Sequence, residues 1–140
     1  LHLCDRRQRQ MCIRDSFKQE EVNVEFLSRE ELDVLMNKGF TIKRLEQVRD
    51  IFVFCCFTAL AFVDVQQLSR EHLIKDNNGT LWIRKARQKT NQMCNIPVLS
   101  IPQRILRKYE DNAECIKKGV LLPVISNQRM NAYRAPVKVA

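Results

Sequence analysis

The first run of apolar residues at helical spacing begins after Ser28 and ends near Lys38. The side chains that share one face of this run are Leu32, Leu35 and Met36. Glu31 follows Ser28 by three residues, a spacing at which each side chain can accept a hydrogen bond from the other residue's backbone N–H. Gly39 comes just after the run, where glycine is the preferred residue type. The pattern therefore predicts a helix over residues 28–38.

A longer apolar segment follows and predicts the central helix of the fold. It starts at about residue 41 or 43 and continues to Leu60. Its first turns are amphipathic, whereas from Ile51 nearly every side of the helix is apolar. A helix of this kind is stable when neighbouring elements cover it, so we expect it to be buried. Residues 64–68 are expected to form a short helical turn after it.

The pattern then changes from helical spacing to short β-rich segments. Strands are predicted over 72–75, 81–87 and 95–99, with turns at 76–80 and 90–92. Three strands joined by short turns form an antiparallel meander. Farther along, a helix is predicted over 101–110, with Pro102 in its first turn, and residues 110–119 are expected to form a polar loop. A last helix is predicted from Ser126 through Tyr133.

These elements indicate an α+β fold that is mainly helical. The helices at 28–38 and 101–110 are expected to pack on the central helix, and the three-stranded antiparallel meander is expected along one edge.

Net charge narrows the class of partner. The 140-residue chain is 45% hydrophobic, which is enough for a packed core, and its formal net charge is +8 at pH 7. Residues 84–140 hold twelve basic and three acidic residues, so the positive excess lies in that part. Such an excess favours a polyanion, usually nucleic acid, although a solvated basic face without a partner is an equal alternative.

Cysteine and histidine usage gives no sign of a metal site. The chain has six cysteines without a C-x2-C pair, and two histidines. Cys55 and Cys56 are expected to be small hydrophobes with free thiols inside the central helix, as in a reduced cytoplasmic protein. The longest apolar run, residues 51–63, is shorter than the roughly 20 residues of a membrane-spanning helix. No membrane association is expected.

The two ends of the chain differ from the rest. Residues 9–16 resemble translated sequencing-adapter sequence, and we expect residues 1–21 to be an unstructured segment foreign to the natural protein. A basic DNA-binding arm is the alternative for this segment. Residues 22–134 are expected to form the folded unit, and residues 135–140 an artefactual or disordered tail.

Two short motifs carry the candidate chemistry. The predicted central helix ends in Thr58-Ala59-Leu60-Ala61-Phe62-Val63-Asp64, and the second predicted strand leads into Gln88-Lys89-Thr90. In this order, with a predicted hairpin between them, the motifs resemble the catalytic domain of the tyrosine recombinases, the phage-integrase family. The chain resembles integrases of Bacteroides-type conjugative elements, and the resemblance covers the first half of such a domain, roughly residues 22–134.

The resemblance implies DNA integration and recombination by cleavage and rejoining of DNA strands, without a metal ion, ATP or another cofactor. Lys89 matches the hairpin lysine that protonates the leaving 5′-oxygen, and Asp64 matches an acid that supports the site. Ala61 occupies the position of the arginine that binds the scissile phosphate. Since alanine cannot donate a charge-assisted hydrogen bond, the source of that positive charge is left open.

Each of these residues also has a plainer interpretation. Lys89 could be an ordinary exposed turn lysine, and Asp64 could cap the helical turn that follows it. The residues predicted to bind DNA phosphates without reading bases are Arg84, Lys85, Arg87 and Thr90. For the strand residues among them, a solvated strand face is the alternative.

Parts of the family's site are missing from the sequence. The family completes its site with a His-x-x-Arg box, a further His or Trp, and a nucleophilic tyrosine. The only histidines are His2 and His72, and the only tyrosines are Tyr109 and Tyr133, neither of which matches the family's nucleophile. Without that nucleophile no phosphotyrosine bond forms, so this chain alone is expected to be inactive and at most DNA-binding.

Two further functions stay open: a non-catalytic basic DNA-binding module, and a small interaction domain with incidental charge. By resemblance, the parent recombinase is expected to assemble as a tetramer on DNA. The chain itself is expected to be a monomer, or to aggregate through apolar surface left open on the central helix.

Overall fold

The computed structural model describes residues 26–126, 128–129 and 132. The expectations for residues 1–21 and 135–140, and for Tyr133 at the end of the last predicted helix, lie outside the described residues. In chain order the elements are α2 (Arg29–Asn37), α3 (Lys43–Thr58), α4 (Phe62–Gln66), the 3-10 helix η1 (Arg70–His72), β1 (Leu73–Lys75), β2 (Leu81–Ala86), β3 (Met93–Pro97), α5 (Ser100–Lys108) and α6 (Ala113–Lys118). The expected α+β class, with a three-stranded antiparallel sheet, is confirmed.

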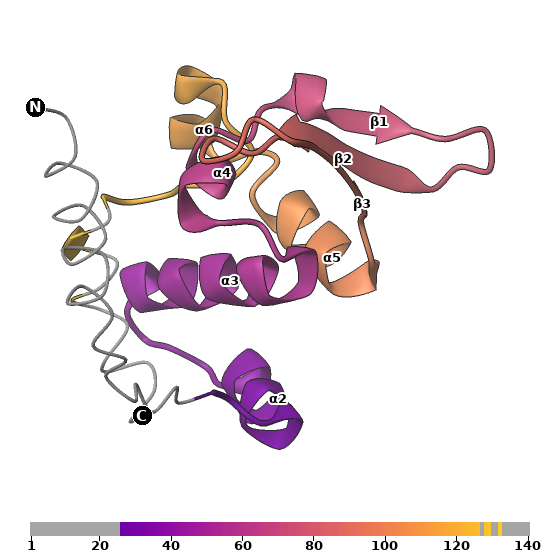
Figure 1. Cartoon of the computed structure of the whole chain (residues 1–140). Coiled ribbons are helices and arrows are strands. Elements are labelled where there is room, and N and C mark those ends of the chain that lie inside the picture. Colours follow the sequence, from indigo (N-terminus) through magenta and orange to yellow (C-terminus); the bar gives the residue numbers. More distant parts are fainter. Residues whose placement is uncertain (1–25, 127, 130–131, 133–140) are drawn as a thin grey trace, which may run out of the picture.

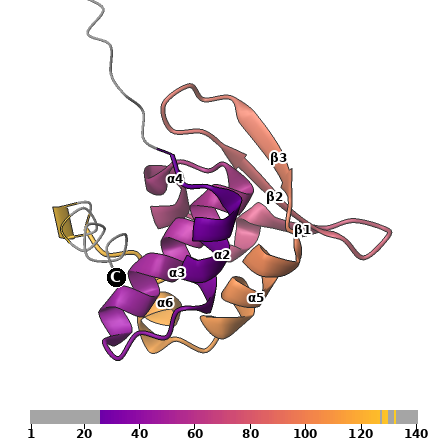
Figure 2. The same cartoon turned by 90° about the horizontal axis from the view of Figure 1, so that it is seen from below.

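The central element is α3, with α2 on one side of it and the sheet on the other (Figure 1). Figure 2, seen from the side of α2, shows α2 crossing α3 with α5 beside them. Ile51 and Phe54 of α3 are fully buried and share a core with Val65, Ile83 and Leu122. Burial of this helix was expected, and in the described residues none of its large apolar side chains is among the exposed ones. Phe52 and Phe57 are only partly buried and Cys56 is exposed, so the expectation of open apolar surface on the central helix stays a prediction.

The capping box at the start of α2 forms as expected. The Glu31 backbone N–H donates to Ser28 Oγ at 3.2 Å, and the Ser28 N–H donates to the Glu31 carboxylate at 2.8 Å. The end of α2 differs from the prediction, because Lys38 is extended and Gly39 has no positive φ. The Arg49 guanidinium donates to the Lys38 carbonyl and stacks 5.6 Å from the centroid of the Phe40 ring. These contacts direct the chain from α2 toward α3.

The end of α3 also differs from the prediction by two residues. The helix stops at Thr58 rather than Leu60, because Ala59 adopts a left-handed conformation with φ 52°. The Thr58 hydroxyl donates to the Phe54 carbonyl at 2.7 Å inside the core. This change of direction allows α4 to begin at Phe62, two residues before the predicted turn.

The meander has the predicted order, β1-β2-β3, with antiparallel pairing throughout. Ile83 of β2 faces Leu73 on one side and Ile96 on the other, so the middle strand provides the core residue of the sheet. Strand bounds shift by one or two residues, since residues 70–72 form η1 and β3 begins at Met93. Gly79, with φ 81°, lies in the turn between β1 and β2.

The prediction of a polar loop over 110–119 is wrong, because α6 forms there. The Asn112 side chain accepts hydrogen bonds from the N–H groups of Glu114 at 3.0 Å and Cys115 at 3.3 Å, which caps the first turn. Gly119 ends the helix in a left-handed conformation with φ 68°. Cys115 is the one buried side chain of this short helix, too little for a periodic signal.

No helix in the described part of the chain has the length and apolar character to cross a membrane. Within residues 26–126, 128–129 and 132, no three or more His, Cys, Asp or Glu side chains are grouped in a way that could hold a metal ion.

Candidate nucleic-acid interface

The two sequence motifs lie together in space. Asp64, in the first turn of α4, is only 2% exposed, and its Oδ1 accepts a hydrogen bond from the Gln88 backbone N–H at 2.9 Å. This bond ties the α3–α4 junction, residues 58–64, to the β2–β3 turn, residues 87–92. The alternative that Asp64 caps the helical turn is wrong, since the N-cap position is Ala61, whose side chain has no polar atom.

Arg87 makes a second link between the same two segments. Its Nη2 donates to the Ala59 carbonyl at 3.4 Å, and its Nε donates to Cys94 Sγ at 3.2 Å. The Ala59 carbonyl lies at the C-terminal end of α3, where the helix dipole favours a positive group. Arg87 therefore places an exposed guanidinium beside the junction that contains Ala61.

The β2–β3 turn is also held by its own backbone. The Arg87 N–H donates to the Gln92 carbonyl at 2.9 Å, and the Asn91 N–H donates to the Arg87 carbonyl at 2.8 Å. Asn91 takes a left-handed conformation with φ 54°, which asparagine tolerates better than most residues. Two internal bonds and the bond to Asp64 give the turn a defined shape.

Lys89 and Thr90 lie at the tip of this turn, and both are exposed. Among the described residues, the Lys89 ammonium has no hydrogen-bond or ion-pair partner. A lysine with a free ammonium on an anchored turn is available to a phosphate group from outside the protein.

The predicted DNA-binding residues of β2 do not share one face. Arg84 is exposed, whereas Lys85 points to the same side as the buried Ile83 and is only 9% exposed. The Lys85 Nζ donates to the Gln67 carbonyl at 3.4 Å. Lys85 thus links β2 to the end of α4, while Arg84 points to the other face of the sheet. The alternation of side chains along a strand could have predicted from the sequence that Arg84 and Lys85 lie on opposite faces.

The described tyrosine and histidine have structural contacts. The Tyr109 hydroxyl is buried and donates to Asp50 Oδ2 at 2.8 Å. Burial raises the pKa of Tyr109, and the hydrogen bond and charge of Asp50 raise it further. His72 Nδ1 accepts from the Ser69 N–H at 3.1 Å. Because the Tyr109 hydroxyl is buried, it is not open to a phosphate group from outside the protein. Tyr133 lies outside the described residues.

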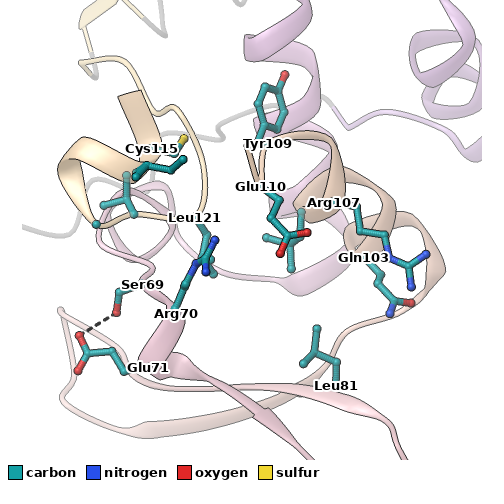
Figure 3. Close-up of a pocket in the computed structure, with 14 residues that line it drawn as sticks. Ser69, Arg70, Glu71, Leu81, Gln103, Arg107, Tyr109, Glu110, Cys115 and Leu121 are labelled. Atoms are coloured by element: carbon teal, nitrogen blue, oxygen red, sulfur yellow. Dashed lines mark hydrogen bonds between the residues drawn. The ribbon is translucent and has the colours of Figure 1, made fainter. Parts of the chain in front are cut away.

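A cavity of about 710 Å³ lies between η1, α5 and α6 (Figure 3). Apolar side chains such as Leu121 line it together with two arginines and two glutamates. The four charged residues are Arg70, Glu71, Arg107 and Glu110. The Ser69 hydroxyl donates to Glu71 at 3.1 Å at its edge. The formal charges of this lining sum to zero.

Searches against known protein families, curated proteins and solved structures find no match to this chain.

Proposed function

We propose that this chain is a DNA-binding part of a tyrosine-recombinase catalytic domain, with the Lys89 turn placed against the DNA backbone. The observation that carries the proposal is the hydrogen bond from the Gln88 N–H to Asp64. It brings the acid of one motif to the turn that presents the lysine of the other. Neither motif is specific alone, but a direct contact between them is what a shared site requires.

Under this proposal, Lys89 donates the proton to the 5′-oxygen that leaves when a DNA strand is cut. The attacking nucleophile belongs to a longer protein that includes the His-x-x-Arg box and the catalytic tyrosine. This chain alone binds DNA without cutting it, because the hydroxyl of Tyr109 is buried and hydrogen-bonded to Asp50.

Arg87 supplies the positive charge that Ala61 cannot. Its guanidinium contacts the Ala59 carbonyl, two residues before Ala61, and its exposed position leaves N–H groups free for a phosphate. The arginine therefore comes from the residue that follows β2 rather than from the helix junction.

A non-catalytic DNA-binding module is the second candidate function. Exposed Arg84, together with the basic excess after residue 84, favours it without any reference to catalysis. The two candidates differ in the role of Lys89, which is a proton donor in the first and one of several phosphate contacts in the second.

Binding is tested first, by fluorescence anisotropy with a short DNA duplex at salt concentrations from about 50 to 200 mM. We expect affinity to fall with salt, and Lys89→Ala to weaken binding roughly five- to tenfold while lowering the salt slope by about one. Lys117→Ala on α6 is the matched control, since it removes the same charge from an exposed lysine on another element. Equal effects of the two variants would contradict a defined interface at Lys89.

The catalytic role needs a longer version of the chain that supplies the missing box and tyrosine. A DNA strand whose leaving 5′-oxygen is replaced by sulfur needs no proton donor, because a thiolate is a better leaving group. The Lys89→Ala variant should then cleave the sulfur substrate nearly as fast as the unmodified protein does. On normal DNA its cleavage rate should fall roughly 10²–10⁴-fold. Equal losses on both substrates would favour the binding-module alternative.

A further inference from the structure

A second cavity, of about 820 Å³, lies at the N-terminal end of α3. Cationic side chains from three separate parts of the chain line it. They are Lys43 and Arg44 of α3, Lys118 of α6, and Arg129. Glu114 is the one acidic residue of this lining among the described residues, so the lining carries a net charge of +3.

Within the described residues, the cations of this cavity outnumber its one carboxylate. In the described part of the chain, none of the four has a hydrogen-bond or ion-pair partner. Lys108 provides a contrast, because its ammonium binds both Glu46 and Asp50. Like charges gathered around one hollow repel one another, and a bound anion would relieve that repulsion.

The backbone of α3 adds to the same electrostatic preference. The N-cap residue is Ile42, and no side chain caps the first turn of this 16-residue helix. The first backbone N–H groups of a helix have no partner inside the helix, and the positive end of its dipole lies there. Side chains and backbone thus both favour a negative ligand at this end of α3.

This cavity is separate from the Lys89 turn. The far end of α3, at Ala59, accepts the hydrogen bond from Arg87. A 16-residue helix is roughly 24 Å long, so a phosphate at Lys43 and Arg44 is not one that Arg87 can reach.

We propose that the cavity lined by Lys43, Arg44 and Lys118 is a binding site for phosphate groups of a polyanion. An oligophosphate and a nucleic-acid backbone share this chemistry, and the test distinguishes them. The proposal does not depend on the recombinase function, because free oligophosphate is one of its ligands.

The test uses the whole chain and inorganic tripolyphosphate, measured by isothermal titration calorimetry. Lys118→Gln is compared with Lys117→Gln, because both lysines are exposed in the last turn of α6 but only Lys118 lines the cavity. We expect saturable binding to the unmodified chain, a loss of about fivefold or more for Lys118→Gln, and less than about twofold for Lys117→Gln. Circular dichroism verifies that both variants fold.

Absence of saturable tripolyphosphate binding by the unmodified chain, or equal losses for the two variants, would overturn the site. The same pair measured with a DNA duplex identifies the source of the phosphate. A larger loss of DNA affinity for Lys118→Gln than for Lys117→Gln indicates a nucleic-acid backbone, and equal DNA affinities indicate a free oligophosphate. Lys89→Ala should leave tripolyphosphate binding unchanged, which separates this site from the DNA proposal.

Discussion

Single residues hold the β2–β3 turn against the α3–α4 junction, and Asp64 is the most buried of them. Asp64→Ala would leave the Gln88 N–H without its acceptor, at a cost of about 1–3 kcal/mol. We expect faster hydrogen exchange of the Gln88 amide by NMR, together with weaker DNA binding. Asp64→Asn keeps a side-chain oxygen as acceptor and should have a smaller effect. Unchanged exchange in Asp64→Ala would show that the bond does not hold the turn.

Arg87 gives a second prediction at this scale. Arg87→Ala should weaken DNA binding roughly five- to tenfold, since one phosphate contact is lost. If Arg87 supplies the charge missing at position 61, then adding Ala61→Arg to that variant should restore most of the affinity. Anisotropy at constant salt measures both. If Ala61→Arg does not restore binding, Arg87 does not replace the charge that is missing at position 61.

At the scale of elements, α3 and α5 are joined by a buried polar cluster. Asp50 is 5% exposed and accepts hydrogen bonds from Arg49, Lys108 and Tyr109. Asp50→Ala leaves the buried Tyr109 hydroxyl without its acceptor, whereas Lys108 keeps Glu46 and Arg49 keeps the Lys38 carbonyl. We therefore expect the free energy of unfolding to fall by about 3 kcal/mol. Tyr109→Phe removes one bond and should cost about 1 kcal/mol. Urea denaturation measures both, and equal losses would contradict this account.

The same cluster predicts how stability depends on pH. Partial burial alone would lower the pKa of Lys108, but the hydrogen bonds and charges of Asp50 and Glu46 outweigh it and raise the pKa. Burial and Asp50 raise the pKa of Tyr109 as well. A group whose pKa is higher in the folded state stops stabilising that state as the pH rises above the group's ordinary pKa. The ordinary pKa is 10.5 for Lys108 and 10.0 for Tyr109. Unfolding free energy should therefore fall above about pH 10, less steeply in Tyr109→Phe.

Most helices and strands could be predicted from local patterns in the sequence. Features that depend on contacts between distant residues could not. The Ser28 capping box and the meander follow from residues near one another in the chain, and both are confirmed. α6 was missed because a six-residue helix with one buried side chain has no periodicity. The partner of Asp64 is a backbone group 24 residues away, which no local pattern contains. The burial of Lys85 was accessible from strand alternation alone.

At the scale of the whole molecule, the exposed apolar side chains bear on association. In the described residues the exposed large ones lie on different elements or loops: Phe26, Val34, Ile42, Val63, Ile74, Met93, Leu99 and Ile116. Because they are not confined to one element, we expect a monomer of 16.5 kDa in sedimentation velocity. A discrete tetramer of this chain without DNA would contradict this prediction.

The bond that Asp64 accepts comes from a main-chain N–H, and this has a consequence for variation. Every amino acid except proline provides that donor, so the side chain at position 88 is free to change. Position 88 can therefore change without loss of the bond that attaches the turn. A substitution there alters the side chain next to Lys89 and leaves the fold that holds the turn in place.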